Sequence, residues 1–528
     1  MAQAEKESYF EDDIENQLGS KVANVVSFGT FGRFSAIIIS GIAFVIVARI
    51  LGPSVYGIYT LAISAAAFFT AVADLGVNTA VNKLIGQYSD KKDKKELDKV
   101  LSDGYASVLA TGLLFTLILF IFSGSVASLM GSPSMTYDVQ VVSFIIVFTM
   151  LFSLSYYALI SFGKGSYVAW IIIQQSIVQS VISILLAFMG FGALAPILGL
   201  MAGYALSVII TLVILVRKFE IEFVKPSLRR IKHLLGFSSP IALYNGSRSI
   251  VGSLAPIVLG ILGSTIIVGN WGVATRAIGS VSNLMEILAL SALPAFSYTV
   301  ASKQVSKNIG KLYNYVTYFS FIIIVPAMLF VALLSKQLSY TVFSARYALA
   351  PSYLSIISLG MLLWVVADYT SMLLVSTDRI KNTVKYMLMI SLIEFVSFFF
   401  AIPLLGGVGL ALVIYVMVPL LIILFMGFHI KRHLGISLDV KRLLYVFAVG
   451  LLSAAFILPV VFLLSTHYVS TIIVSFVEQL LLYPILLAGL GAVGKKEIKT
   501  LKSITDKIPV MGTLIRLLAE YAEHFVRS

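Results

Sequence analysis

About fourteen apolar segments recur along this chain, and each is long enough to cross a lipid bilayer, which takes roughly 20 residues. No water inside a bilayer can satisfy backbone polar groups, so such segments form helices. Charged residues make up only 12% of the chain, about half their share in a soluble domain. The sequence therefore predicts an all-α integral membrane protein with about 14 transmembrane helices. The expected spans are 25–51, 55–84, 101–124, 138–162, 166–190, 193–217, 237–263, 267–297, 312–335, 351–376, 382–405, 407–429, 443–465 and 470–493.

The stretch 29–82 predicts two of these helices joined by a tight turn. The turn is the run Leu51-Gly52-Pro53-Ser54, where Pro53 ends the first helix and suits the first turn of the next. Both helices carry small and polar residues at spacings that place them on one face. They are Gly29, Arg33, Ala36 and Ser40 on the first helix, and Thr60, Ser64, Ala67, Ala71, Asp74 and Asn78 on the second. Arginine and aspartate are costly in apolar surroundings, so Arg33 and Asp74 are candidate site residues.

A degraded second copy of this pattern occurs in the middle of the chain. Residues 260–264 resemble residues 49–53, and residues 269–273 resemble residues 55–58. Polar and small residues again share a face of the helix on each side of the turn. They are Asn245, Arg248 and Gly252 before it, and Gly272, Arg276, Gly279, Asn283 and Glu286 after it. Transporters are often built from internal repeats, so the pattern indicates a duplicated six-helix half.

The basic residues follow the membrane and give no sign of a nucleic-acid partner. The chain has 38 Lys and Arg residues and a formal net charge of +13. Five of them fall in the loop 85–100, five in the loop 218–236 and seven in the tail 494–528, whereas the expected outer loops hold only Lys336 and Arg346. The positive-inside rule therefore predicts a multi-pass protein of the cell (cytoplasmic) membrane with both termini in the cytoplasm. The absence of cysteine excludes disulfides and thiolate chemistry.

These features divide the chain into six expected segments. A short acidic tail comes first, and no cleavable signal peptide precedes the first span. The last segment has apolar and charged residues in helical alternation and is expected at the headgroups. The segments are a cytoplasmic tail (1–20), an N-lobe with spans one to six (21–217), a basic cytoplasmic linker (218–236), a C-lobe with spans seven to twelve (237–429), spans thirteen and fourteen (430–493) and an amphipathic cytoplasmic tail (494–528).

The first hairpin resembles that of a known family. The run Ala48-Arg49-Ile50-Leu51-Gly52-Pro53-Ser54-Val55-Tyr56-Gly57-Ile58-Tyr59 and the later Asp74-Leu75-Gly76-Val77-Asn78 are similar to the polysaccharide flippases of the multidrug/oligosaccharidyl-lipid/polysaccharide (MOP) exporter superfamily. The resemblance covers residues 20–493, although Gly269-Asn270-Trp271-Gly272 replaces the usual turn in the second half. It implies two six-helix lobes around a central cavity, with two extra C-terminal helices. It also implies that a lipid-linked oligosaccharide moves from the cytoplasmic to the outer leaflet.

The chemistry of such a cargo matches residues of the chain. A polyprenyl-pyrophosphate-sugar has an apolar tail, two negative phosphates and a polar glycan. Arginine suits phosphate because its donors form a planar fork and it stays protonated. Arg33, Arg248 and Arg276 are therefore the expected cargo contacts, and the amides that share their faces are Asn78, Asn245 and Asn283. Alternatively, each arginine neutralises an acid such as Asp74 or Glu286 and only holds helices together. For Arg49, near the turn, a structural role is expected.

The remaining polar residues of the spans leave two interpretations open. The acids Asp74, Glu286, Asp368, Glu394 and Glu478 either form structural pairs or couple transport to protons or sodium. Gln174, Gln175 and Gln179 either hydrogen-bond between helices or contact sugar hydroxyls. The run 199–203 has glycine at both ends, which favours close helix packing.

Three functions compete. The first is a flippase for lipid-linked oligosaccharides that works by alternating access during the assembly of surface polysaccharides. The second is a cation-coupled multidrug exporter of the same superfamily. The third is a membrane polysaccharide polymerase or glycosyltransferase, which the sequence disfavours because it has no P-loop, HExxH or nucleophile elbow and only short outer loops. We therefore expect no enzyme activity, no metal and no cofactor. The expected partners are the lipid-linked oligosaccharide and membrane lipids, with glycosyltransferases or other assembly proteins left open, and the expected state is a monomer.

Overall fold

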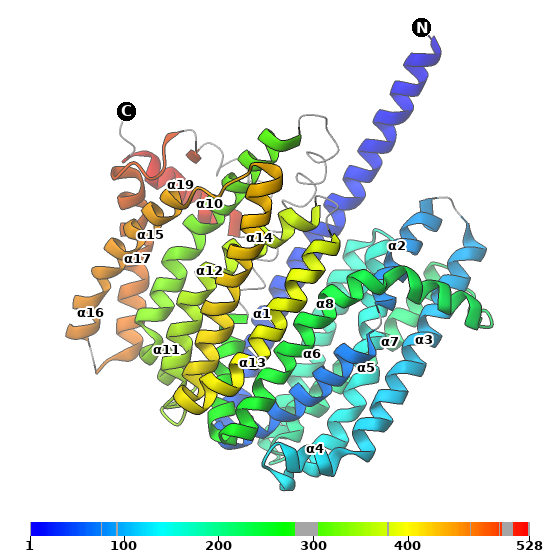
Figure 1. Cartoon of the computed structure of the whole chain (residues 1–528), viewed down its shortest axis with the longest axis horizontal. Helices are drawn as coiled ribbons and strands as arrows, with labels where there is room; N and C mark the ends of the chain where they lie inside the picture. The colour runs from blue at the N-terminus through cyan, green and yellow to red at the C-terminus, as the bar shows by residue number, and fades with distance from the viewer. Residues whose placement is uncertain are drawn as a thin grey trace. The chain divides into compact units, whose positions relative to one another are not determined.

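The computed structural model of the chain describes residues 2–74, 76–90, 93–279, 305–376, 380–464, 466–495, 497–498 and 511–525. Within these residues every regular element is helical (Figure 1), which confirms the predicted all-α class. The first half contains α1 (Ala2–Ala73), α2 (Val77–Asp90), α3 (Lys94–Ile121), α4 (Ser123–Leu129), the 3-10 turn η1 (Pro133–Met135), α5 (Thr136–Ser161), α6 (Gly165–Phe188), α7 (Leu194–Lys218) and α8 (Leu228–Leu262). A further helix covers residues 265–279. Then follow α10 (Val305–Leu333), α11 (Ser335–Val342), α12 (Ala350–Ser376), α13 (Ile380–Leu412), the π-helical turn η2 (Val413–Met417), α14 (Val418–Leu434), α15 (Val440–Ala455), α16 (Ile457–Leu463), α17 (Tyr468–Gly489) and α19 (Met511–Glu523).

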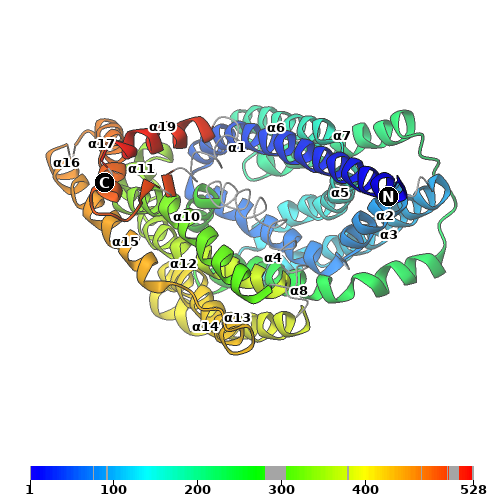
Figure 2. The ribbon, with the colours of Figure 1, turned by 90° about the horizontal axis from the view of Figure 1, so that it is seen from above.

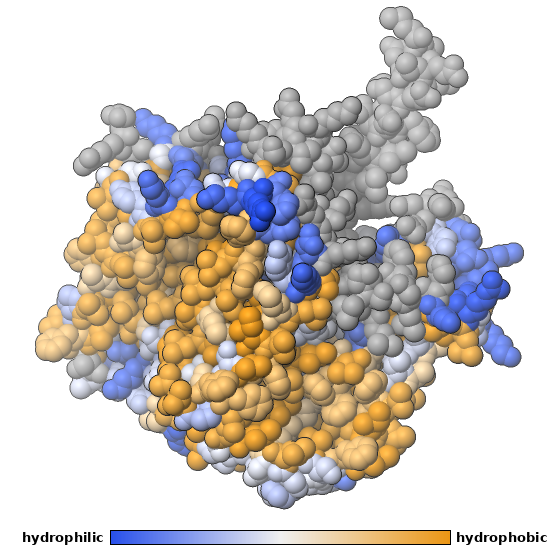
Figure 3. Space-filling model, in the orientation of Figure 1, coloured by the Kyte–Doolittle hydropathy of each residue, from blue (hydrophilic) through white to orange (hydrophobic). Residues whose placement is uncertain are grey.

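Ten helical stretches among the described residues are long and apolar enough to cross a membrane. Two of them, 31–73 and 382–434, have 43 and 53 residues, so each covers two of the expected spans. The expected span 267–297 lies largely outside the described residues. In the space-filling view of Figure 3, hydrophobic residues cover most of the coloured surface, and hydrophilic residues gather toward its top and right margins. The protein is thus a multi-pass membrane protein, while the number of 14 spans stays a prediction.

Contacts within the chain define two compact units. Unit 1 comprises Met1–Val47, Ala65–Ser128 and Pro133–Ile250, and unit 2 comprises Ala48–Ser64, Leu129–Ser132 and Val251–Ser528. The turn of the first hairpin therefore packs with the second half of the chain. The reason is visible in its contacts, because the Tyr347 hydroxyl donates a hydrogen bond of 2.7 Å to the carbonyl oxygen of Ala48.

Helices α6 and α7 of unit 1 pack unusually closely, in agreement with the glycine spacing. A β-carbon added to Gly203 would lie 2.9 Å from the carbonyl oxygen of Gln175, and one added to Gly199 would overlap the Ser183 hydroxyl. The two helices lie side by side in both ribbon views (Figures 1 and 2). This arrangement confirms the predicted role of the run 199–203 in helix packing.

The second helix of the first hairpin is interrupted near its C-terminal end, which the sequence did not predict. Gly52 adopts φ 70° and breaks α1 at the predicted turn. The expected span 55–84, however, is not one helix, because α1 ends at Ala73 and α2 begins at Val77. Between them the Gly76 amide donates to the Asp74 carboxylate at 3.1 Å, and Gly76 has φ 78°. A left-handed residue stops the helix, so Asn78 lies on a different helix from Thr60.

The expected span thirteen is also interrupted. Helix α15 ends at Ala455 and the short α16 begins at Ile457. Both belong to unit 2, where α15 and α17 lie side by side (Figure 2). The Ser453 hydroxyl on α15 donates to the side-chain oxygen of Gln479 on α17 at 2.9 Å. A buried interhelical hydrogen bond therefore joins the helices that fall in the expected spans thirteen and fourteen.

Candidate functional site

Arg33 is anchored within unit 1 by a tyrosine. Its Nη2 donates to the Tyr156 hydroxyl on α5 at 2.8 Å, and its guanidinium carbon lies 5.9 Å from the centre of that ring. The neighbouring Gly32 brings α1 against α6, because an added β-carbon would lie 2.5 Å from the Cα of Ala169. The Arg33 side chain is half-buried. The Tyr156 hydroxyl is thus a neutral acceptor for Arg33.

Arg248 also belongs to unit 1. It lies on α8, within the apolar stretch 246–262, and its side chain is exposed. An exposed side chain on a membrane-spanning helix meets either lipid or water, and a charge in lipid is costly. Exposure at this position therefore favours a water-lined surface.

Arg276 belongs to unit 2, on the helix 265–279. Its side chain is exposed. Gly272, four residues earlier on the same helix, packs closely against the first hairpin, because an added β-carbon there would lie 3.1 Å from the Tyr56 ring. The helix that carries Arg276 is thus packed against the first hairpin.

The expected amides and acids take different positions. Asn78 is buried on α2, and the Asp74 carboxylate just before α2 accepts the Gly76 amide at 3.1 Å. Asp74 therefore closes the break between α1 and α2, which supports its structural interpretation. The side chain of Asn245, and Asn283 and Glu286 as a whole, lie outside the described part of the chain.

Asp368 and Glu394 differ in how far their side chains are buried. Asp368 is exposed although its immediate neighbours on α12 are buried, whereas Glu394 on α13 is only 8% exposed. Glu478 on α17 has one carboxylate oxygen buried without a hydrogen-bond partner among the described residues. Among the candidate acids that the structure describes, only Asp368 thus has an exposed side chain.

The glutamines of α6 serve helix packing. The Ser207 hydroxyl on α7 donates to Gln174 at 3.0 Å, and Gln175 donates to Gln179 at 2.7 Å. The first contact joins α6 to α7 and favours interhelical hydrogen bonding for Gln174, whereas the second lies within α6. Arg49 likewise has a structural place, because it donates to the carbonyl oxygens of Val342, at 2.7 Å, and Thr341.

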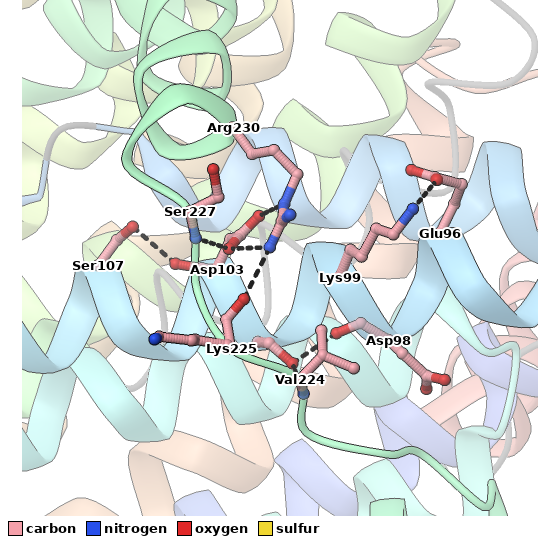
Figure 4. A network of polar contacts seen from close by, with 10 residues as sticks. Glu96, Asp98, Lys99, Asp103, Ser107, Val224, Lys225, Ser227 and Arg230 are labelled. Carbon is pink, nitrogen blue, oxygen red and sulfur yellow. Dashed lines mark hydrogen bonds and ion pairs between the residues drawn. The ribbon is translucent and has the colours of Figure 1, made fainter.

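Sequence reasoning missed a cluster of three polar residues on α3, which binds the linker (Figure 4). The Asp98 carboxylate accepts the Glu222 amide at 3.0 Å, and the Ser102 hydroxyl accepts the Val224 amide at 2.9 Å. Asp103 accepts the Ser227 amide at 2.9 Å and both Nε and Nη2 of Arg230, at 2.5 and 3.0 Å. We call this arrangement the linker strap. Its sequence signal was the spacing Asp-x₃-Ser-Asp, which puts Asp98 and Ser102 on one face of the helix, with Asp103 about 100° further round.

The strap fixes where α8 begins. Asp103 is 1% exposed, and burial of a carboxylate is favourable only when it is paired and hydrogen-bonded. The Asp103 carboxylate raises the pKa of the Arg230 guanidinium, chiefly through their hydrogen bond. Since Arg230 lies in the first turn of α8, the helix that carries Arg248 is attached to α3 at its start.

Comparison with known proteins identifies the family. A family model described as polysaccharide biosynthesis protein matches residues 46–352. The succinoglycan biosynthesis transport protein ExoT of Rhizobium meliloti is 30% identical over 167 residues, which span 31% of this chain and only 30% of ExoT. An uncharacterized membrane protein in the cps region of Klebsiella pneumoniae is 23% identical over 384 residues, covering 69% of this chain and 73% of that protein.

Solved structures show the same fold. The lipid II flippase MurJ in an inward closed conformation has a TM-score of 0.68 at 16% identity, over 87% of this chain and 98% of MurJ. An inward-facing multidrug resistance MATE family transporter of the MOP superfamily has a TM-score of 0.62 at 15% identity, over 76% and 98%. These likenesses concern architecture. Together with the family match they confirm the resemblance seen in the first hairpin: the chain belongs to the polysaccharide biosynthesis protein family and has the all-helical fold of MOP superfamily transporters.

Proposed function

We propose that the protein is a flippase for a lipid-linked oligosaccharide, carried on polyprenyl pyrophosphate or a related lipid, and that it moves the headgroup from the cytoplasmic to the outer leaflet by alternating access. The observation that carries the proposal is the placement of Arg33, Arg248 and Arg276. All three lie on apolar helices and keep exposed or half-exposed side chains. A positive charge within the membrane is costly, and binding a phosphate group of the solute would compensate for that cost.

The family supports the cargo class. Its description is polysaccharide biosynthesis, and ExoT is named as a transport protein for succinoglycan biosynthesis. The basic loops 85–100 and 218–236 support cytoplasmic termini. We propose that the protein acts as a monomer without enzyme activity, and that assembly enzymes supply and consume its cargo.

A second candidate is a cation-coupled multidrug exporter. The exposed Asp368 in the middle of buried α12 neighbours favours it, because an acid would attract a cationic solute. The test is a comparison of cargoes in proteoliposomes. Fluorescent lipid-linked oligosaccharide diphosphates should move between leaflets, and cationic dyes should not accumulate. Dye transport without movement of the lipid would overturn the proposal in favour of the second candidate.

A further inference from the structure

We propose that Tyr156 is a positioning residue that orients the Arg33 guanidinium toward an anionic lipid headgroup. The inference rests on the proposed function, because it assumes that Arg33 contacts the diphosphate of the cargo. It adds the residue that determines in which direction the arginine points.

The contact between the two side chains is a directed hydrogen bond. The distance from Arg33 Nη2 to the Tyr156 hydroxyl is 2.8 Å, which is ideal for such a pair. The guanidinium carbon lies 5.9 Å from the ring centre, at the outer limit of a cation–π interaction. The hydroxyl, rather than the ring face, is therefore the part of Tyr156 that orients Arg33.

Tyr156 is itself held in place by neighbouring rings. Phe152 lies 6.4 Å away with an interplanar angle of 23°, and Tyr157 packs edge-on at 5.5 Å. Phe152 in turn stacks on Tyr204 of α7 at 4.7 Å. Since a tyrosine has few rotatable bonds, this stack leaves the hydroxyl in one place. On the other side, the contact of Gly32 with Ala169 fixes the distance of α1 from α6.

A tyrosine is a suitable partner for this purpose because it is neutral. A carboxylate at the same distance would cancel the charge of Arg33, whereas a phenol accepts one hydrogen bond and leaves the charge in place. Bidentate binding of a phosphate needs only two of the five N–H donors of a guanidinium. Tyr156 thus lowers the conformational freedom that Arg33 would lose on binding, which is the usual gain of preorganisation.

The test is a double-mutant cycle on transport of a fluorescent lipid-linked oligosaccharide diphosphate. Tyr156→Phe removes the hydroxyl and keeps the ring, and Tyr157→Phe is the matched control. We expect Tyr156→Phe to raise the half-saturating cargo concentration about 10-fold, as for one lost hydrogen bond to a charged group, with little change in the maximal rate. Tyr157→Phe should change neither. In the Arg33→Ala background, Tyr156→Phe should have no further effect, because its effect acts through the arginine.

The outcomes separate the inference from the proposed function. If Arg33→Ala transports the lipid with wild-type parameters, Arg33 is no cargo contact, so the inference fails while the flippase function stands. If the wild-type protein moves no lipid, the proposed function itself fails. If Arg33→Ala is impaired but Tyr156→Phe adds its full effect to it, only the positioning role of Tyr156 is overturned.

Should Tyr156→Phe fail to fold, Phe152→Leu replaces it in the cycle. It removes the stacked ring and should raise the half-saturating concentration by a smaller factor, again only when Arg33 is present. An equal rise without Arg33 would contradict the inference.

Discussion

Gly57 and Gly269 contact each other's helices reciprocally, backbone against backbone, within unit 2. A β-carbon added to Gly57 would overlap the carbonyl oxygen of Thr265, and one added to Gly269 would overlap the carbonyl oxygen of Pro53. Each added β-carbon would also lie 3.1 Å from the amide nitrogen of the other glycine. Such an approach requires that neither helix has a side chain at the crossing. The two segments that the sequence predicts as repeats therefore cross at a glycine that follows the turn in each.

Substitution of Gly57 should weaken this crossing. Gly57→Ala places a methyl group against backbone that cannot move aside, so we expect a loss of stability of about 1–3 kcal/mol, typical of overpacking, and a lower Tm in detergent. Gly41→Ala is the control, since an added β-carbon there meets nothing within 4 Å. It should leave the Tm unchanged or raise it, because alanine favours a helix. Equal Tm values for the two variants would contradict the close packing at Gly57.

The same crossing can be locked. The side-chain oxygens of Ser54 and Thr265 are 3.5 Å apart, and the chain contains no cysteine, so a Ser54→Cys, Thr265→Cys pair would be the only thiols present. Oxidation should form the disulfide in high yield and stop transport if the turn must separate from residue 265 during the cycle. Reductant should restore activity, and either single variant should be insensitive to oxidant. Undiminished transport by the cross-linked protein would show that the crossing stays closed throughout.

The linker strap should depend on the charge of Asp103. Asp103→Asn keeps the size of the side chain but turns one acceptor toward Arg230 into a donor, so we expect a loss of about 2–3 kcal/mol, as for a buried hydrogen bond to a charged group. Hydrogen exchange should then rise in residues 222–230. Arg230→Ala leaves the bond from the Ser227 amide to Asp103 and should cost less. Equal protection of the linker in wild type and Asp103→Asn would rule out the strap.

The fold could be predicted where neighbouring residues determine the structure, and the site could be predicted only in part. The length of the apolar segments predicts the membrane helices, and Gly52 with Pro53 predicts the turn of the first hairpin. The break at Asp74 was missed because Asp74 suited the polar stripe of a continuous helix, while the decisive fact is the positive φ of Gly76. The partners of Arg33 and Asp103 could not be foreseen, since Tyr156 and Arg230 are distant in sequence. Burial of Asp103 depends on tertiary packing, which an expected helix start at residue 101 does not reveal.

Glu497 should make the end of the chain sensitive to acid. Burial alone would raise the pKa of this carboxyl, but hydrogen bonds, including those from Arg442 and the Gly494 amide, lower it below its ordinary value of 4.5. The contact to Arg442 is 2.8 Å, and Arg442 lies over the Tyr318 ring at 3.8 Å. A lowered folded-state pKa gives stability that is present above the unfolded value and is lost as pH falls through the folded one.

We therefore expect Glu497→Gln to lower stability by about 1 kcal/mol at pH 7. The difference from wild type should shrink below about pH 4.5, where the wild-type carboxyl also becomes protonated. Thermal unfolding in detergent across this pH range measures it. Glu520→Gln is the control, because Glu520 forms an exposed pair with Arg516 that is worth only a few tenths of a kcal/mol. A difference that persists at low pH would assign the effect to packing instead of charge.

Replacing Arg248 should separate cargo binding from folding. Its side chain is exposed on α8, so Arg248→Ala should insert and unfold like wild type, while two phosphates that leave water lose their compensating charge. Arg248→Lys restores the charge without the planar fork and should recover transport only in part.

The membrane potential should assist transport by the wild-type protein. Two anionic charges moving outward gain about 4–5 kcal/mol per 100 mV of inside-negative potential. Wild-type flipping should therefore accelerate with a potassium diffusion potential, whereas Arg248→Ala should stay inactive. Arg217→Ala, at the exposed end of α7, controls for the loss of any arginine. Wild-type rates in Arg248→Ala would leave Arg248 as a structural residue and remove it from the cargo path.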